Sequence, residues 1–143
     1  MRPSVKEIMK VLFTACALTA AALVAGCGGG DDSNPYAENV KLKVGQTRVL
    51  DAANLTMAMT KFVDSRCPRN TQCASAGSAV IDVAVSAKGF ASTTLQMTLT
   101  PGAANPTYTY GPYRMEFVDL VPYPESPVLT ITDSEATVVV RRD

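Results

Sequence analysis

The 143-residue sequence has no histidine and no tryptophan, and aromatic residues make up only 6% of it. Without histidine the chain cannot form a Ser-His-Asp triad or a Cys-His nucleophile pair. It also shows no phosphate-binding loop and no nucleotide fingerprint. The carboxylates Asp64, Asp82, Glu116 and Asp119 have no recognisable catalytic spacing. We therefore expect no enzymatic activity, no catalytic residues and no cofactor.

The sequence also lacks an excess of either charge, with 13 basic and 13 acidic residues. The three basic residues and one acidic residue within positions 1–26 belong to a predicted leader, described next. Its removal leaves 10 basic against 12 acidic residues, a formal charge of about −2. Nucleic-acid-binding domains present a basic patch, so we expect no nucleic-acid partner.

A lipoprotein signal peptide is indicated by the first 27 residues. Positive charges at Arg2, Lys6 and Lys10 precede an uncharged run from Val11 to Gly26, which is short for a membrane-spanning helix. The run ends in Val24-Ala25-Gly26-Cys27, which is typical of a lipobox. Cleavage would then occur before Cys27, whose sulfur would be diacylated. The alternatives are an ordinary secretory signal, with Cys27 a plain thiol, and a stop-transfer helix.

Lipidation at Cys27 predicts a protein of the bacterial cell envelope that is attached to the membrane through its lipid anchor. One acyl chain anchors a protein only marginally, whereas each further buried methylene adds about 0.8 kcal/mol, so two or three chains hold it firmly. Gly28, rather than an aspartate retention signal, follows the cysteine. If the host is Gram-negative, we expect the outer membrane.

The chain is expected to divide into three segments. Residues 1–26 form the signal peptide, and residues 27–38 form the lipidated cysteine with a flexible tether rich in glycine and aspartate. Residues 39–143 form one domain with a modest core. The tether is interpreted as a spacer, and its glycine run followed by acids also resembles surface-export tethers.

Two cysteines remain after the leader is accounted for, because Cys16 leaves with the signal peptide and Cys27 is acylated. In an oxidising envelope Cys67 and Cys73 are expected to pair, and closing so short a loop stabilises the fold by about 2 kcal/mol. A redox-active pair is the alternative, although redox motifs space their cysteines by two residues, not five. Two thiols without histidine do not make a zinc site, so we expect no metal.

From Asn39 onward apolar residues alternate with polar ones, a period typical of β-strands. Seven short strands are expected, around Leu42–Val44, Thr47–Asp51, Leu55–Val63, Ala79–Val85, Leu95–Leu99, Tyr113–Phe117 and Thr137–Val140. Glycine and proline turn signals separate them, and no convincing helix is present. The pattern predicts an all-β fold, an antiparallel two-sheet sandwich of about seven strands, with a small closed barrel as the alternative. The methionine and leucine stripes are interpreted as core.

One motif resembles a known family. Asp64-Ser65-Arg66-Cys67-Pro68, a short loop, then Cys73 and Gly77 are similar to a family of small uncharacterised bacterial lipoproteins and exported domains. Leu120-Val121-Pro122-Tyr123-Pro124 is similar to the closing segment of that family. The family pattern has tryptophan where this chain has Ser75. The resemblance covers most of residues 39–143 and implies a fold and a location but no activity.

The motif has two readings. Asp64 and Ser65 are good turn formers, and Arg66 is expected to pair with Asp64 or to reach a backbone carbonyl. In the structural reading, the motif is a stapled connection between two strands. In the functional reading it is a rigid binding loop, whose candidate residues are Arg66, Arg69, Asn70, Thr71 and Gln72. A disulfide would lower the entropy cost of binding through such a loop.

The function expected from these features is a non-catalytic binding or interaction module that contacts an envelope protein or a glycan. One alternative is a hydrolase-inhibitor-like domain that uses loop 66–72, and another is a structural subunit of an envelope complex. Glycan binding would be favoured by a concave surface made of tyrosines, and edge packing is the other interpretation of these residues. The tyrosines concerned are Tyr108, Tyr110, Tyr113 and Tyr123.

Overall fold

The computed structural model describes residues 35–126 and 133–142. The predicted signal peptide, the lipidation site at Cys27 and the tether up to residue 34 lie outside these ranges. Within them the chain forms eight strands and one short 3-10 turn, so the all-β prediction is confirmed. No helix in the described part is long and apolar enough to cross a membrane.

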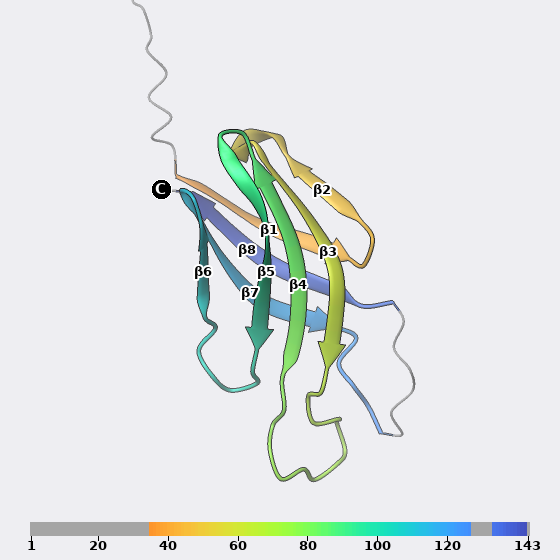
Figure 1. Ribbon diagram of the computed structural model, residues 1–143. Coiled ribbons are helices and arrows are strands. Elements are labelled where there is room, and N and C mark those ends of the chain that lie inside the picture. The colour runs from red at the N-terminus through yellow and green to blue at the C-terminus, as the bar shows by residue number, and fades with distance from the viewer. Residues whose placement is uncertain (1–34, 127–132, 143) are drawn as a thin grey trace, which may run out of the picture. The chain divides into compact units, whose positions relative to one another are not determined.

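The strands form two four-stranded antiparallel sheets that face each other as a sandwich (Figure 1). The β1 sheet has the order β1-β8-β7-β6, and the β3 sheet has the order β2-β3-β4-β5. The strands are β1 (Tyr36–Lys43), β2 (Thr47–Leu50), β3 (Leu55–Asp64), β4 (Ala79–Ala87), β5 (Phe90–Leu99), β6 (Thr107–Tyr110), β7 (Tyr113–Val121) and β8 (Glu135–Arg142), and the 3-10 turn is η1 (Asp51–Ala53). The chain changes sheet between β1 and β2, and again between β5 and β6.

The core lies between the sheets and is built from the alternate residues that the sequence pattern singled out. In β3, Leu55, Met57 and Met59 are fully buried, and in β4 the same holds for Ile81 and Val83. Successive side chains of a strand point to opposite faces, so a period of two places every second residue inside. The methionine and leucine stripes are therefore core.

The structure adds strand residues that periodicity did not predict. β6 is a separate strand of four residues between Pro106 and Gly111, too short for its alternation to be distinguished from a loop. The first half of β5, from Phe90 to Thr94, has no apolar alternation and becomes a strand by pairing with β4. β1 begins at Tyr36, three residues before the expected start of the domain.

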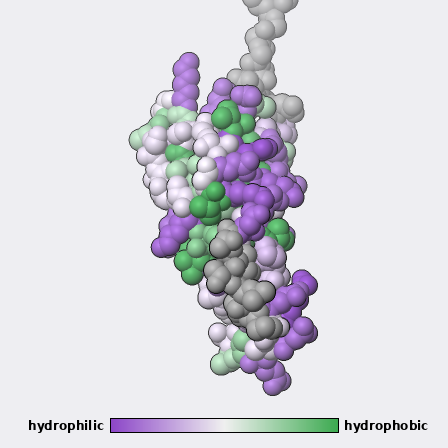
Figure 2. Space-filling model, turned by 90° about the vertical axis from the view of Figure 1, so that its right-hand side faces the viewer, coloured by the Kyte–Doolittle hydropathy of each residue, from purple (hydrophilic) through white to green (hydrophobic). Residues whose placement is uncertain are grey.

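The outer faces of the two sheets differ in charge. On the β1 sheet, Lys41 pairs with Glu135 at 2.9 Å and Arg141 with Glu116 at 2.9 Å. The hydrogen bond to Glu135 raises the pKa of Lys41. The β3 sheet presents mainly threonine, serine, alanine and valine. Its charged residues include Lys61 and Asp82, which are opposite each other in the register of β3 and β4. Figure 2 views the domain along the sandwich edge, and near-neutral residues gather on one side and hydrophilic ones on the other.

Candidate functional site

The connection between β3 and β4 is a stapled loop, residues 65–78. A disulfide joins Cys67 and Cys73, with the Cα atoms 5.9 Å apart, as the sequence predicted. At the base, the Ser65 N–H donates to the Ser78 carbonyl and the Cys67 N–H donates to the Ala76 carbonyl, both at 2.8 Å. The two arms thus extend the pairing of β3 with β4. Only residues 68–75 protrude beyond this base.

Gly77 allows the two arms to approach each other. Its φ is +66°, and a Cβ atom at this position would lie 1.9 Å from the Ser65 carbonyl oxygen. Any side chain here would collide with backbone and would also adopt the left-handed conformation that L-residues avoid. The glycine of the motif is therefore a requirement of the loop base.

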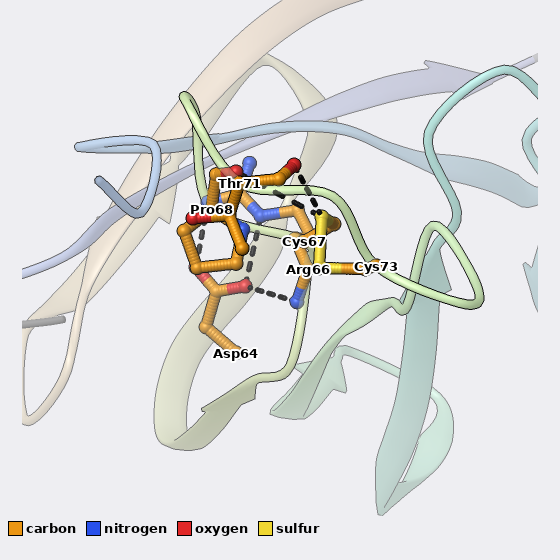
Figure 3. Close-up of a disulfide and its surroundings, with 6 residues drawn as sticks. All are labelled: Asp64, Arg66, Cys67, Pro68, Thr71 and Cys73. Atoms are coloured by element: carbon orange, nitrogen blue, oxygen red, sulfur yellow. Dashed lines mark hydrogen bonds and ion pairs between the residues drawn. A yellow bond between two sulfur atoms is a disulfide. The ribbon is translucent and has the colours of Figure 1, made fainter. Parts of the chain in front are cut away.

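Arg66 is buried beneath the loop together with Asp64 (Figure 3). Its Nε donates to Asp64 Oδ1 at 2.9 Å and its Nη2 donates to Oδ2 at 2.6 Å, a bidentate pair. The side chains of Arg66 and Asp64 are only 2% and 8% exposed. The backbone N–H of Arg66 also donates to Asp64 Oδ1, at 3.1 Å. Such charge-assisted pairs in a dry environment are strong and geometrically specific.

The same guanidinium ties the stapled loop to the opposite sheet. Its Nη2 donates to the carbonyl of Leu120, near the end of β7, at 2.9 Å, and to that of Pro122, which directly follows β7, at 3.3 Å. Both interactions anticipated for Arg66, the pair with Asp64 and the bond to a backbone carbonyl, are therefore present. Because Arg66 is buried, a partner cannot reach its side chain. The remaining candidate binding residues are Arg69, Asn70, Thr71 and Gln72.

A second segment, residues 123–125, lies against the loop. The Arg69 N–H donates to the Pro124 carbonyl at 2.9 Å, and the Arg69 guanidinium lies 3.8 Å from the Glu125 carboxylate. The Tyr123 ring centroid is 4.4 Å from the guanidinium carbon of Arg66 and 5.2 Å from that of Arg69. Cation–π contacts of this kind stabilise exposed sites modestly. Local sequence pattern could not predict that Glu125 pairs with the loop, since 56 positions separate it from Arg69.

The tip of the loop is polar and exposed. Arg69, Asn70, Thr71 and Gln72 are all exposed, and so is Ser75. We call Arg69–Gln72 together with Tyr123 and Glu125 the loop-tip surface. Its side chains project from a base that is held by a disulfide, by two backbone hydrogen bonds and by Arg66. The arrangement can present hydrogen-bond donors with little backbone entropy left to lose.

The other three tyrosines considered for glycan binding do not form a concave surface. Tyr110 and Tyr113 are buried, Tyr108 is half-buried, and each hydroxyl bonds backbone of the β3 sheet or of η1. Tyr113, for example, donates to the Ala53 carbonyl. These three tyrosines therefore pack at the edges of the sandwich and do not form the concave surface expected for glycan binding. Of the four tyrosines considered, only Tyr123 belongs to the loop-tip surface.

Elsewhere, the described residues offer little chemistry. A shallow hollow of about 380 Å³ lies on the outer face of the β3 sheet, and its lining has neither carboxylate, amine nor thiol. Within residues 35–126 and 133–142, no three cysteine, aspartate or glutamate side chains cluster as metal ligands would. The loop-tip surface is therefore the candidate functional site of the described residues.

Fold and site together define an all-β two-sheet sandwich that carries a disulfide-stapled loop. No family model matches the chain, and neither does any curated protein or any solved structure.

Proposed function

We propose that the protein is a lipid-anchored module of the bacterial envelope that binds a partner, without catalysis, through the loop-tip surface. The observation that carries the proposal is the contrast within the stapled loop. Its base is fixed by Arg66, which is buried, whereas its tip exposes Arg69 with 64% of the side chain accessible. Binding residues commonly lie on loops that a rigid scaffold positions.

An inhibitor-like role is the second candidate, and the protrusion of residues 68–75 beyond the paired arms favours it. In that case the partner is a hydrolase whose cleft receives the tip. A role as a structural subunit has less support. Within the described part of the chain, the exposed large apolar residues lie on different strands and turns, and they are Val44, Val49, Val63, Phe90 and Val121.

Combined replacement of the tip residues tests the binding role. Arg69, Thr71 and Gln72 change to Ala and Asn70 changes to Gly, since its φ of +61° would strain alanine. A photo-crosslinking residue at Ser75 of the full chain reports the partner in envelope preparations. We expect crosslinking to fall at least about tenfold, a loss of about 1.4 kcal/mol in binding. The melting temperature should stay nearly unchanged, because all four side chains are exposed and the exposed ion pair of Arg69 with Glu125 contributes little to stability.

A matched control places the same kind of change in β2 and the turn before it. Gln46, Thr47 and Arg48 are exposed and have no side-chain hydrogen bond among the described residues. Their combined change to Ala should leave crosslinking at Ser75 intact. Equal crosslinking by the tip variant and the control would show that the loop is only a connection between strands.

The proposed anchor is tested by a different substitution in the full chain. Cys27→Ala should abolish metabolic labelling with a palmitate analogue, because the sulfur that takes the diacylglycerol is gone. Cys16→Ala is the control and should keep the label, since Cys16 lies in the leader that is removed. Labelling that persists in Cys27→Ala and disappears in Cys16→Ala would contradict the lipobox interpretation.

A further inference from the structure

The four edge strands of the sandwich are not protected in the same way. An edge strand exposes unpaired backbone groups, and proteins protect such edges by short length, by charge or by a cover. β2 and β6 have only four residues each, and β1 carries Lys41 and Lys43. β5, the remaining edge, has ten residues from Phe90 to Leu99, with no charge, proline or glycine. Its protection must come from elsewhere in the fold.

Two tyrosine hydroxyls of β6 reach the backbone of β5 and the end of β4. The Thr98 N–H donates to the Tyr108 hydroxyl at 2.8 Å. The Tyr110 hydroxyl donates to the Ala91 carbonyl at 3.1 Å and accepts from the Ala87 N–H at 3.1 Å. A hydroxyl has one donor and two acceptor lone pairs, so both bonds of Tyr110 can form together. The ties fall near the two ends of β5, which lies beside β6 in Figure 1.

Ring packing adds to the closure at the start of β5. The Phe90 ring lies 5.9 Å from the Tyr110 ring, centroid to centroid. It also covers the turn between β6 and β7, because a Cβ atom on Gly111 would lie 2.6 Å from the Phe90 ring. This side of the sandwich is therefore closed by side chains and not by strand pairing.

We propose that Tyr108 and Tyr110 close the β5 edge against strand pairing with a second copy of this chain. The alternation of an antiparallel ladder turns the backbone groups of Thr94 and Gln96 to the same side as the Thr98 N–H. Release of the tyrosines thus leaves a continuous row of donors and acceptors.

Because β5 carries no charge, a second copy of β5 can pair with this edge without charge repulsion. Its outward side chains are Ser92, Thr94, Gln96 and Thr98. An antiparallel pair of two β5 strands about a two-fold axis presents the same edge to each partner. It places no like charges opposite each other, which is the usual penalty that prevents such pairing.

The test uses the full chain with a photo-crosslinking residue at Thr94. Tyr108→Phe combined with Tyr110→Phe keeps both rings and removes both hydroxyls. We expect the yield of covalent dimer to rise about tenfold over the otherwise unchanged chain, which corresponds to about 1.4 kcal/mol. In the monomer, amide exchange at Thr98 and Ala87 should become faster, because the hydroxyls of Tyr108 and Tyr110 that accept from them are lost.

Tyr113→Phe is the matched control, since it removes a tyrosine hydroxyl bond that ends at Ala53 and not at β5. It should not increase the dimer. If Tyr113→Phe gives as much dimer as the double variant, general destabilisation explains the result and the proposal fails. If the double variant gives no more dimer than the unchanged chain, the β5 edge is not closed by these hydroxyls.

A third variant separates edge pairing from other association. Gln96→Lys, added to the double variant, places a charge at the centre of the exposed edge, where two copies would bring lysines together. The dimer yield should return to that of the unchanged chain. A yield that stays high would show that the copies associate through another surface, which overturns the proposal.

Discussion

Replacement of Arg66 with methionine is expected to destabilise the domain by about 3–5 kcal/mol, the cost of breaking a buried ion pair by removing one partner. Asp64 would remain 8% exposed without its bidentate donor, and the carbonyls of Leu120 and Pro122 would lose a shared donor. Urea denaturation of residues 35–143 measures the change as a shift in midpoint at constant slope.

Arg69 provides the control for this prediction. It is the same residue type, and its guanidinium also lies over Tyr123, but its side chain is 64% exposed. Arg69→Ala should cost less than about 1 kcal/mol, since exposed ion pairs contribute little. A loss of similar size in both variants would show that contact with Tyr123, and not burial of the pair with Asp64, supports the loop.

A double variant tests whether the cost comes from the charge left behind. Replacing Asp64 with leucine together with Arg66→Met removes both charges from the buried site. Apolar replacement of a whole buried pair is often neutral or stabilising. We expect the double variant to recover part of the stability lost in Arg66→Met, although the carbonyls of Leu120 and Pro122 still lack their donor.

Gly77→Ala is expected to have the second largest effect, about 3 kcal/mol or more. About 1 kcal/mol follows from the left-handed backbone, and the rest follows from separating the arms to relieve the contact with the Ser65 carbonyl oxygen. The hydrogen bond from the Cys67 N–H to the Ala76 carbonyl, next to Gly77, should be lost with it. Thermal unfolding and amide exchange at Cys67 measure the two effects.

Gly89 is the matched control because it shares the positive φ without the crowding. Its φ is +87°, and no atom lies within 4 Å of the position that a Cβ would take. Gly89→Ala should therefore cost only about 1 kcal/mol, the conformational part alone. If the two variants lose the same stability, the close approach at Ser65 is not what requires glycine at position 77.

The Arg66 and Gly77 variants also test whether the rigidity of the loop base contributes to partner binding. Each change leaves the exposed side chains Arg69 to Gln72 in place and loosens the base that holds them. If rigidity contributes to binding, either variant should weaken partner crosslinking at temperatures where the domain is still folded. Comparison of these variants with the tip variant separates the contribution of the loop base from that of the exposed side chains.

Much of this fold followed from local sequence. The alternation in Leu55, Met57 and Met59 and in Ile81 and Val83 predicted strands with one buried face, because a strand turns every second side chain inward. The pairing of Cys67 with Cys73 followed from counting cysteines. β6 was missed because four residues carry too little periodicity, and strand formation there depends on pairing with β7.

The candidate site could be predicted only in part. The motif located the loop and its exposed tip, and it indicated that Arg66 would pair with Asp64, two positions away. The second half of the loop-tip surface, Tyr123 and Glu125, lies more than 50 positions from Arg69 along the chain. Local pattern has no information on such a contact, because it depends on how β7 ends beside the loop.

By itself, the sequence determined the all-β class, the inward faces of β3, β4 and β7, and the disulfide, since these depend on neighbours along the chain. The tertiary structure alone decided which polar groups are buried. Arg66 became internal because the end of β7 brings two carbonyls to its guanidinium. Tyr108 and Tyr110 became edge contacts because β6 lies beside β5. Burial of a polar side chain requires partners in space, and their positions follow from the packing of the two sheets.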